Sequence, residues 1–161
     1  MKKLFSMVAA LAASLAFADA AFDYDEACSE FDRFYVGAVA TGTLPQGGSK
    51  ISPRAGAAVR AGCYLAEMWA IEGEAGFADD HLAFAAKALW HWWGYERLDP
   101  FFTFGARGWT HDGNVGPSGG LGAFYHMTES LSLRFDADAT LGLDTDVEMI
   151  YSLAFGLQLS F

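Results

Sequence analysis

The feature that most constrains how this chain can fold is a strict two-residue alternation at its end. Over residues 151–161 every second side chain is large and apolar, and those between are small or polar. The apolar set is Tyr151, Leu153, Phe155, Leu157, Leu159 and Phe161. Because successive side chains of a β-strand point to opposite faces, the pattern predicts a strand with one apolar and one polar face.

The same alternation recurs through the chain and predicts eight strands. We place them at residues 34–43, 54–65, 68–77, 81–93, 101–110, 120–127, 131–141 and 151–161. Most have close to the 9–11 residues that a tilted membrane strand requires. Residues 42–53 and 111–119 are rich in glycine, proline and other turn formers and are expected to be loops. An even number of strands places both ends of the barrel chain on one side of the membrane.

The composition suits strands that cross a membrane. Hydrophobic residues make up 53% of the chain and charged residues 19%, which is below the quarter or so that is usual in soluble domains. After residue 20 no apolar run is long enough for a spanning helix, since Arg60, Lys87 and Arg107 interrupt the candidates. A soluble lipocalin-like barrel is the alternative, with its apolar face inward. Scarce lysine and many small residues on the polar face favour the membrane version.

The first twenty residues have the order of a secretory signal peptide. Two lysines precede an apolar run that is too short to span a bilayer, and Ala18 and Ala20 mark a cleavage site before Ala21. Removing residues 1–20 leaves eight basic and nineteen acidic residues, so a nucleic-acid partner is not expected. Residues 21–33 then form a periplasmic lead-in, and residues 34–161 form the single barrel domain.

Eight charged side chains fall on the predicted polar face, four basic and four acidic. They are Arg60, Glu72, Glu74, Lys87, Arg107, Arg134, Asp136 and Asp138. The expected partners are Arg60 with Glu72, Glu74 with Lys87, and Arg134 with Asp136 or Asp138. Because buried charges are tolerated when they are paired, we predict a salt-bridge plug that closes the lumen. The alternative is a narrow ion path, or a gate that opens when the pairs exchange.

Other candidate chemistry in the sequence is weaker. The carboxylates of the predicted plug are two residues apart on a strand with cations nearby, which favours a structural network over acid–base catalysis. The four histidines lack the spacing of a zinc site, and no cofactor is expected. They are His81, His91, His111 and His126. His126, Ser130 and Glu129 contain the residue types of a catalytic triad, but they span a tight turn from which their side chains diverge. We therefore predict no catalytic residues.

Two further features concern the end of the barrel nearest the chain termini. Cys28 and Cys63 are the only cysteines, and the oxidising periplasm favours a disulfide between them, with two free thiols as the alternative. A group of aromatic residues is expected to form a girdle at the membrane interface. Its predicted members are Trp90, Trp92, Trp93, Tyr125 and Phe161.

The final strand resembles the C-terminal strand of bacterial outer-membrane β-barrels, which ends in a phenylalanine. Residues 120–136 resemble the paired strands that precede it in that class. The chain is thus similar, over residues 34–161, to the OmpA-like and OmpX-like barrels: all-β, eight-stranded, antiparallel, up-and-down and transmembrane. The resemblance implies a place in the bacterial outer membrane against lipid and lipopolysaccharide. It also implies insertion by the barrel-assembly machinery with periplasmic chaperones, for which the alternating residues 151–161 are the signal.

The resemblance does not settle function, because this class contains structural, adhesive, small-pore and enzymatic members. The sequence lacks the peptidoglycan-binding domain of OmpA itself, so a cell-wall tether is not expected. We predict a non-enzymatic protein that supports envelope integrity and presents loops 42–53 and 111–119 to outside partners. The alternatives are a narrow porin-like channel and an enzyme that modifies lipid A.

Overall fold

A computed structural model describes residues 34–45, 53–66, 68–78, 81–92, 97–110, 115–142 and 148–161. The predicted signal peptide and lead-in lie outside these residues, as do Cys28, Trp93 and His111. No helix among the residues described is long and apolar enough to cross a membrane.

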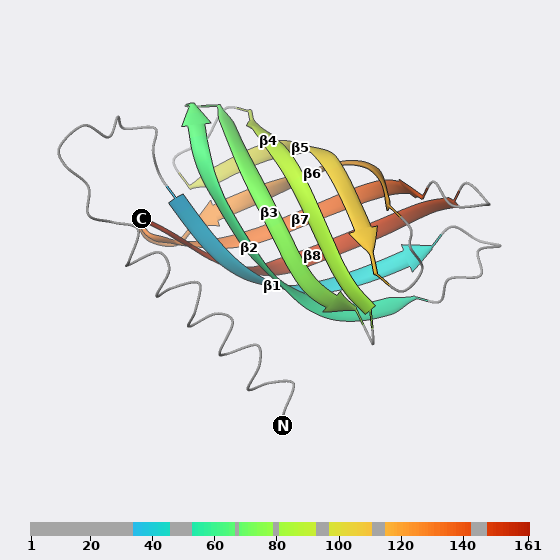
Figure 1. Cartoon of the computed structure of the whole chain (residues 1–161). Coiled ribbons are helices and arrows are strands. Elements are labelled where there is room, and N and C mark those ends of the chain that lie inside the picture. The colour runs from blue at the N-terminus through green and yellow to red at the C-terminus, as the bar shows by residue number, and fades with distance from the viewer. Residues whose placement is uncertain are drawn as a thin grey trace, which may run out of the picture.

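Eight antiparallel strands form one closed barrel in chain order (Figure 1). Their bounds are β1 Phe34–Pro45, β2 Arg54–Ala66, β3 Trp69–Ala78, β4 His81–His91, β5 Leu98–Trp109, β6 Val115–His126, β7 Leu131–Gly142 and β8 Glu148–Ser160. The first and last strands pair from Tyr35 opposite Ser160 to Pro45 opposite Ile150, so the sheet has no free edge. The predicted fold class is confirmed.

Phe34 and Phe161 lie at the same end of the barrel, where the backbone N–H of Phe161 donates to the carbonyl of Phe34 at 2.9 Å. We call this end, which also holds the β2–β3, β4–β5 and β6–β7 connections, the terminus side. The opposite end, with the other four connections, is the loop side (Figure 1).

Three strands begin earlier than the sequence predicts. β5 starts at Leu98 inside a segment predicted as a turn, β6 starts at Val115 rather than at residue 120, and β8 starts at Glu148. In β6, glycines that the sequence predicts as loop residues instead allow the strand to lie close to its neighbour. A Cβ on Gly116 would lie 1.7 Å from the carbonyl oxygen of Leu141 on the neighbouring strand. Glycine is therefore required there for pairing, and composition alone misreads it.

The two faces of the sheet have the polarity of a membrane barrel. The six alternating apolar side chains of residues 151–161 project outward and are 38–54% exposed. The side chains between them point into the lumen, where Ser152 and Gln158 are buried. This arrangement is the reverse of a soluble barrel, in which the apolar face would fill the interior.

Aromatic side chains gather on the outer face near the terminus side. The Trp90 ring stacks on Trp69 and Phe102 at 6.4 and 5.8 Å, and Trp92 stacks on Phe102 at 6.0 Å. Tyr125, near the end of β6, is also exposed on this face. The structure thus adds Trp69 and Phe102 to the group of aromatic residues that the sequence predicts as an interfacial girdle.

Candidate functional site

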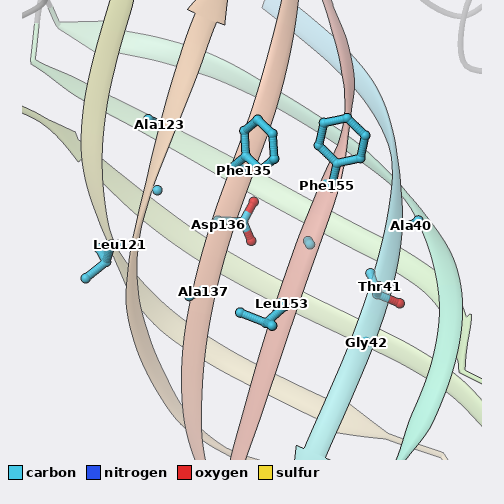
Figure 2. A pocket seen from close by; sticks show the side chains of 12 residues that line it. Ala40, Thr41, Gly42, Leu121, Ala123, Phe135, Asp136, Ala137, Leu153 and Phe155 are labelled. Atoms are coloured by element: carbon cyan, nitrogen blue, oxygen red, sulfur yellow. The ribbon is translucent and has the colours of Figure 1, made fainter.

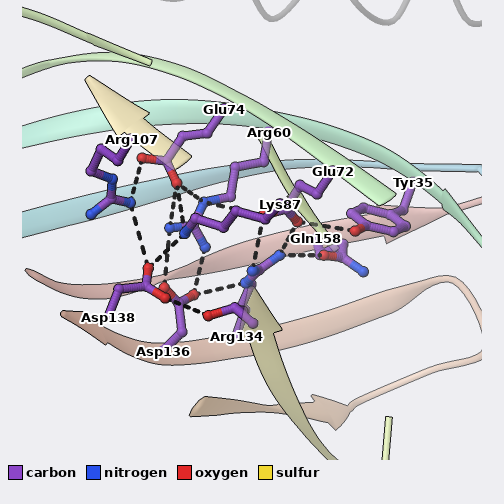
Figure 3. A network of polar contacts seen from close by, with 11 residues as sticks. Tyr35, Arg60, Glu72, Glu74, Lys87, Arg107, Arg134, Asp136, Asp138 and Gln158 are labelled. Atoms are coloured by element: carbon purple, nitrogen blue, oxygen red, sulfur yellow. Dashed lines mark hydrogen bonds and ion pairs between the residues drawn. The ribbon is translucent and has the colours of Figure 1, made fainter. Parts of the chain in front are cut away.

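The middle of the lumen is filled by charged side chains. All eight predicted residues point inward, and each is only 1–6% exposed. They come from five strands: Arg60 on β2, Glu72 and Glu74 on β3, Lys87 on β4, Arg107 on β5, and Arg134, Asp136 and Asp138 on β7. We call this set the charge network (Figure 3).

The best-formed ion pairs cross the lumen. Arg60 donates from Nη1 and Nη2 to the two carboxylate oxygens of Asp136, at 2.5 and 3.1 Å. Arg134 likewise donates from Nη1 and Nη2 to the two oxygens of Glu72, with the Nη2 bond at 3.1 Å. Such two-pronged arginine–carboxylate pairs are among the strongest and most directional polar contacts in proteins. They link β7 to β2 and to β3, which are not its neighbours in the sheet.

Two carboxylates link these pairs to the remaining cations. Glu74 accepts from Arg60 and Arg107, each at 2.8 Å, and lies 3.4 Å from Lys87. Asp138 accepts from Lys87 and from the Thr103 hydroxyl, each at 2.6 Å. Every charge in the network therefore has an opposite charge in contact, the condition under which buried ions are tolerated.

The predicted pairs are present, but they are not the main ones. Arg60 lies 3.9 Å from Glu72, Glu74 lies 3.4 Å from Lys87, and Arg134 lies 2.8 Å from Asp136. For Asp138 the structure gives Lys87 as the near cation. Sequence reasoning could pair only side chains on the same or adjacent strands. The pairs across the lumen depend on strand tilt and stagger, which alternation does not specify.

Three polar residues that support the network were not singled out from the sequence. The Tyr35 hydroxyl donates to Glu72 at 3.0 Å, Thr103 donates to Asp138, and Gln158 accepts from Arg134 at 3.5 Å. The alternation does assign all three to the inner face. That assignment, together with their hydrogen-bonding groups, was the available signal.

A second group of side chains fills the lumen on the terminus side of the network. We call it the aromatic layer, and it consists of Tyr35, Tyr64, Ala70, Leu89, His91, Phe101 and Phe124. The Phe101 and Phe124 rings are 4.7 Å apart, and Tyr35 meets Phe124 edge-on at 6.4 Å. The guanidinium carbon of Arg134 lies 5.0 Å from both phenylalanine rings, within cation–π range. Arg134 therefore joins the two groups.

Glycines opposite the large rings make room for the aromatic layer. Tyr35 is paired in register with Gly62, and Phe101 with Gly122. A Cβ on either glycine would lie 2.4 Å from the opposing ring. The inward rings can thus lie flat over the facing strand, which is the packing that fills a narrow barrel.

The residue types of a catalytic triad that the sequence contains around the β6–β7 turn do not come together in the structure. The Nδ1 atom of His126 lies 2.8 Å from the hydroxyl of Ser132, not Ser130, and Ser130 and Glu129 are exposed in the turn. On the neighbouring strands, His91 Nδ1 lies 2.7 Å from Asp99. Within the described ranges no three His, Cys, Asp or Glu side chains gather as a metal site.

Cys63 lies on β2, half-buried, in register with the outward-facing Phe34. Because Cys28 is outside the described residues, its bond to Cys63 stays a prediction.

The outer surface carries a hollow of about 570 Å³ over β1, β6, β7 and β8. Figure 2 shows Phe135 and Phe155 side by side above it, and their rings are 4.6 Å apart. Small residues such as Ala40 and Ala137 form part of its floor. The hollow is mostly apolar and is lined chiefly by outward-facing side chains, with Asp136 of the charge network also among its lining residues.

Comparison with known proteins identifies the fold. No protein-family model matches the sequence, and no curated protein matches it. Solved structures do. The N-terminal β-barrel domain of Pseudomonas aeruginosa OprF aligns with a TM-score of 0.57 at 18% identity, covering 79% of this chain and 97% of that one. The chain has an outer-membrane β-barrel fold.

Two further structures show the same architecture. Ail, the attachment invasion locus protein of Yersinia pestis, aligns with a TM-score of 0.58 at 10% identity, covering 83% of this chain and 100% of Ail. A de novo designed transmembrane β-barrel aligns with a TM-score of 0.62 at 13% identity, covering 83% and 98%. The barrel's fold and its apolar exterior agree with the predicted location in the bacterial outer membrane.

Proposed function

We propose that this protein is a closed outer-membrane barrel that passes no solutes and contributes to the integrity of the envelope. The observation that carries the proposal is the charge network. Side chains from five strands meet in the lumen, all are nearly inaccessible to solvent, and all are paired with opposite charges.

The network opposes ion passage for a physical reason. A permeating ion must displace paired groups, and separating a buried pair leaves an uncompensated charge in a poorly solvated interior. With four basic and four acidic groups the network has no net charge, so it does not attract ions of either sign as a ring of like charges does.

Conductance in planar bilayers tests the closed lumen. The purified protein, shown to be folded by its mobility on a gel before and after heating, is expected to give no steady currents at any salt concentration. Large and steady open currents would instead support a narrow porin-like channel, the main alternative.

The envelope role is tested in cells. A strain without the gene is expected to be more sensitive to detergents and large antibiotics, and the wild-type gene is expected to restore resistance.

We further propose that the barrel contacts lipopolysaccharide and lipid, and that the assembly machinery and periplasmic chaperones deliver it there. The apolar outer face and Phe161, which follows β8 at the terminus side, support these partners.

We propose no enzymatic activity. The hydrogen bond between His126 and Ser132 resembles part of a catalytic site, but Ser132 is 2% exposed, out of reach of a lipid. Mass spectrometry of lipid A from cells with and without the protein is expected to give identical spectra. A difference that disappears in Ser132→Ala or Ser130→Ala would establish the lipid-modifying alternative.

A further inference from the structure

The lumen contains two different layers of side chains in series along the barrel axis. On β1, β3 and β5, which start at the terminus side, Tyr35, Ala70 and Phe101 come early in each strand. On β2, β4 and β6, which end there, Tyr64, Leu89 and Phe124 come late. The aromatic layer therefore lies between the charge network and the terminus side.

The aromatic layer extends around most of the lumen wall and is largely apolar. Six of the eight strands contribute to it, and Leu89 and Phe124 are 0% exposed. The other two strands supply Ser132 and Gln158, which are also buried. Ring contacts of 4.7–6.4 Å run from Tyr64 through Tyr35 and Phe124 to Phe101. These contacts join rings from four strands across the lumen.

The loop side of the network has the opposite character. A cavity of about 20 Å³, lined by Thr41, Thr43 and Arg107 among others, borders the network there. Among the residues described, Arg107 Nε, which borders this cavity, has no hydrogen-bond partner; the same is true of the Thr140 and Ser152 hydroxyls and, in the aromatic layer, of His91 Nε2. Buried polar atoms beside a cavity of that size are usually satisfied by water. The cavity therefore offers space for about one water beside Arg107, on the loop side of the network.

We infer that the lumen is closed twice, and that the aromatic layer by itself stops ions when the middle of the charge network is removed. The inference rests on the proposed closed-barrel function and assigns a separate barrier to Tyr35, Tyr64, Phe101 and Phe124. An ion that enters this layer exchanges its hydration water mainly for ring faces and aliphatic side chains, which opposes its passage.

Two sets of substitutions separate the barriers. The network variant carries Arg60→Ala, Lys87→Ala, Asp136→Ala and Asp138→Ala. It removes two cations and two anions, and it leaves the Arg134–Glu72 pair and the 2.8 Å Arg107–Glu74 pair in place. The layer variant carries Phe101→Ala and Phe124→Ala. The combined variant carries all six changes.

Conductance in planar bilayers, with folding checked by heat-dependent gel mobility, gives the test. We expect no current steps from the wild type, the network variant or the layer variant, and discrete steps from the combined variant. Steps from the network variant alone would overturn the inference, and so would a folded combined variant without steps. Steps from the wild type would instead overturn the proposed function, so the two failures are distinguishable.

If the combined variant does not fold, a smaller set of three substitutions makes the same test. Lys87→Ala and Asp138→Ala remove one directly bonded pair, and Phe124→Ala removes one ring of the layer. Potassium efflux from vesicles is expected to rise only when the pair and the ring are both absent. Efflux through the pair variant alone, or unchanged efflux with all three substitutions, would contradict two barriers.

Discussion

At the residue scale, the lumen depends on sharing of charges rather than on isolated pairs. Glu74 contacts three cations, and Asp136 accepts from both Arg60 and Arg134. Removing one charged side chain therefore leaves several neighbouring buried charges without a full set of opposite charges. Removing a matched pair leaves the remaining charges close to balance.

This sharing predicts a strong coupling between Arg60 and Asp136. Arg60→Met or Asp136→Leu alone is expected to lower the free energy of unfolding by about 3–5 kcal/mol, because each leaves a buried charge without its main partner. The double variant is expected to lose much less than the sum of the two. Urea unfolding in lipid vesicles measures all three, and additive losses would show that the pair across the lumen is not formed.

Glycine spacing on β6 predicts a second residue-level effect. A Cβ on Gly122 would meet the Phe101 ring at 2.4 Å, whereas on the outward Gly119 its nearest contact would be at 3.5 Å. Gly122→Ala is expected to destabilise the barrel by about 1–3 kcal/mol, and Gly119→Ala to have little effect. Phe101→Leu is expected to relieve part of the first loss. Equal unfolding midpoints for the two glycine variants would contradict this packing.

At the element scale, alternation was a sufficient guide to strand number, pairing order and face. It works because a strand that is lipid-facing on one side and lumen-facing on the other leaves a period of two in the sequence. The predicted start of β6 was wrong, because glycines are favoured both in loops and where two strand backbones lie close together. The partners across the lumen were missed for a different reason, because they lie on strands that are not neighbours.

The last strand also carries the predicted assembly signal, which can be separated from stability. Phe161 is half-exposed, and its backbone holds only the end of the β1–β8 seam. Deleting Phe161 is expected to slow assembly into the membrane in cells while leaving the unfolding free energy of the assembled barrel almost unchanged.

Phe155→Ala is the matched control for this deletion. The Phe155 ring packs on Phe135 at 4.6 Å from the same face of β8, so its loss is expected to lower stability and not the assembly rate. Pulse-chase assays of folded protein, beside unfolding of the purified barrels, measure both effects. If the Phe161 deletion assembles at the wild-type rate, Phe161 is not part of an assembly signal.

At the scale of the whole molecule, the barrel places its polar and apolar material in the order that a membrane requires. The interior holds the charges and the rings, the exterior is apolar, and the aromatic girdle lies near the terminus side. The soluble-barrel alternative predicts that the outer face contacts water. A charge on the exterior lowers stability if that face contacts lipid, and has little effect if it contacts water.

A pair of leucines on one strand tests the membrane band directly. Leu153 lies at the middle of β8 and Leu159 near its terminus-side end, and both project outward. In lipid vesicles Leu153→Arg is expected to lower the unfolding free energy by about 2–4 kcal/mol and Leu159→Arg by about 0–1 kcal/mol, because the cost of arginine falls from the bilayer midplane to the interface. Equal and small losses would mean that water, not lipid, covers the exterior. A depth-dependent loss requires that β8 crosses the bilayer, which places the charge network inside the membrane, where an unpaired ion is least tolerated.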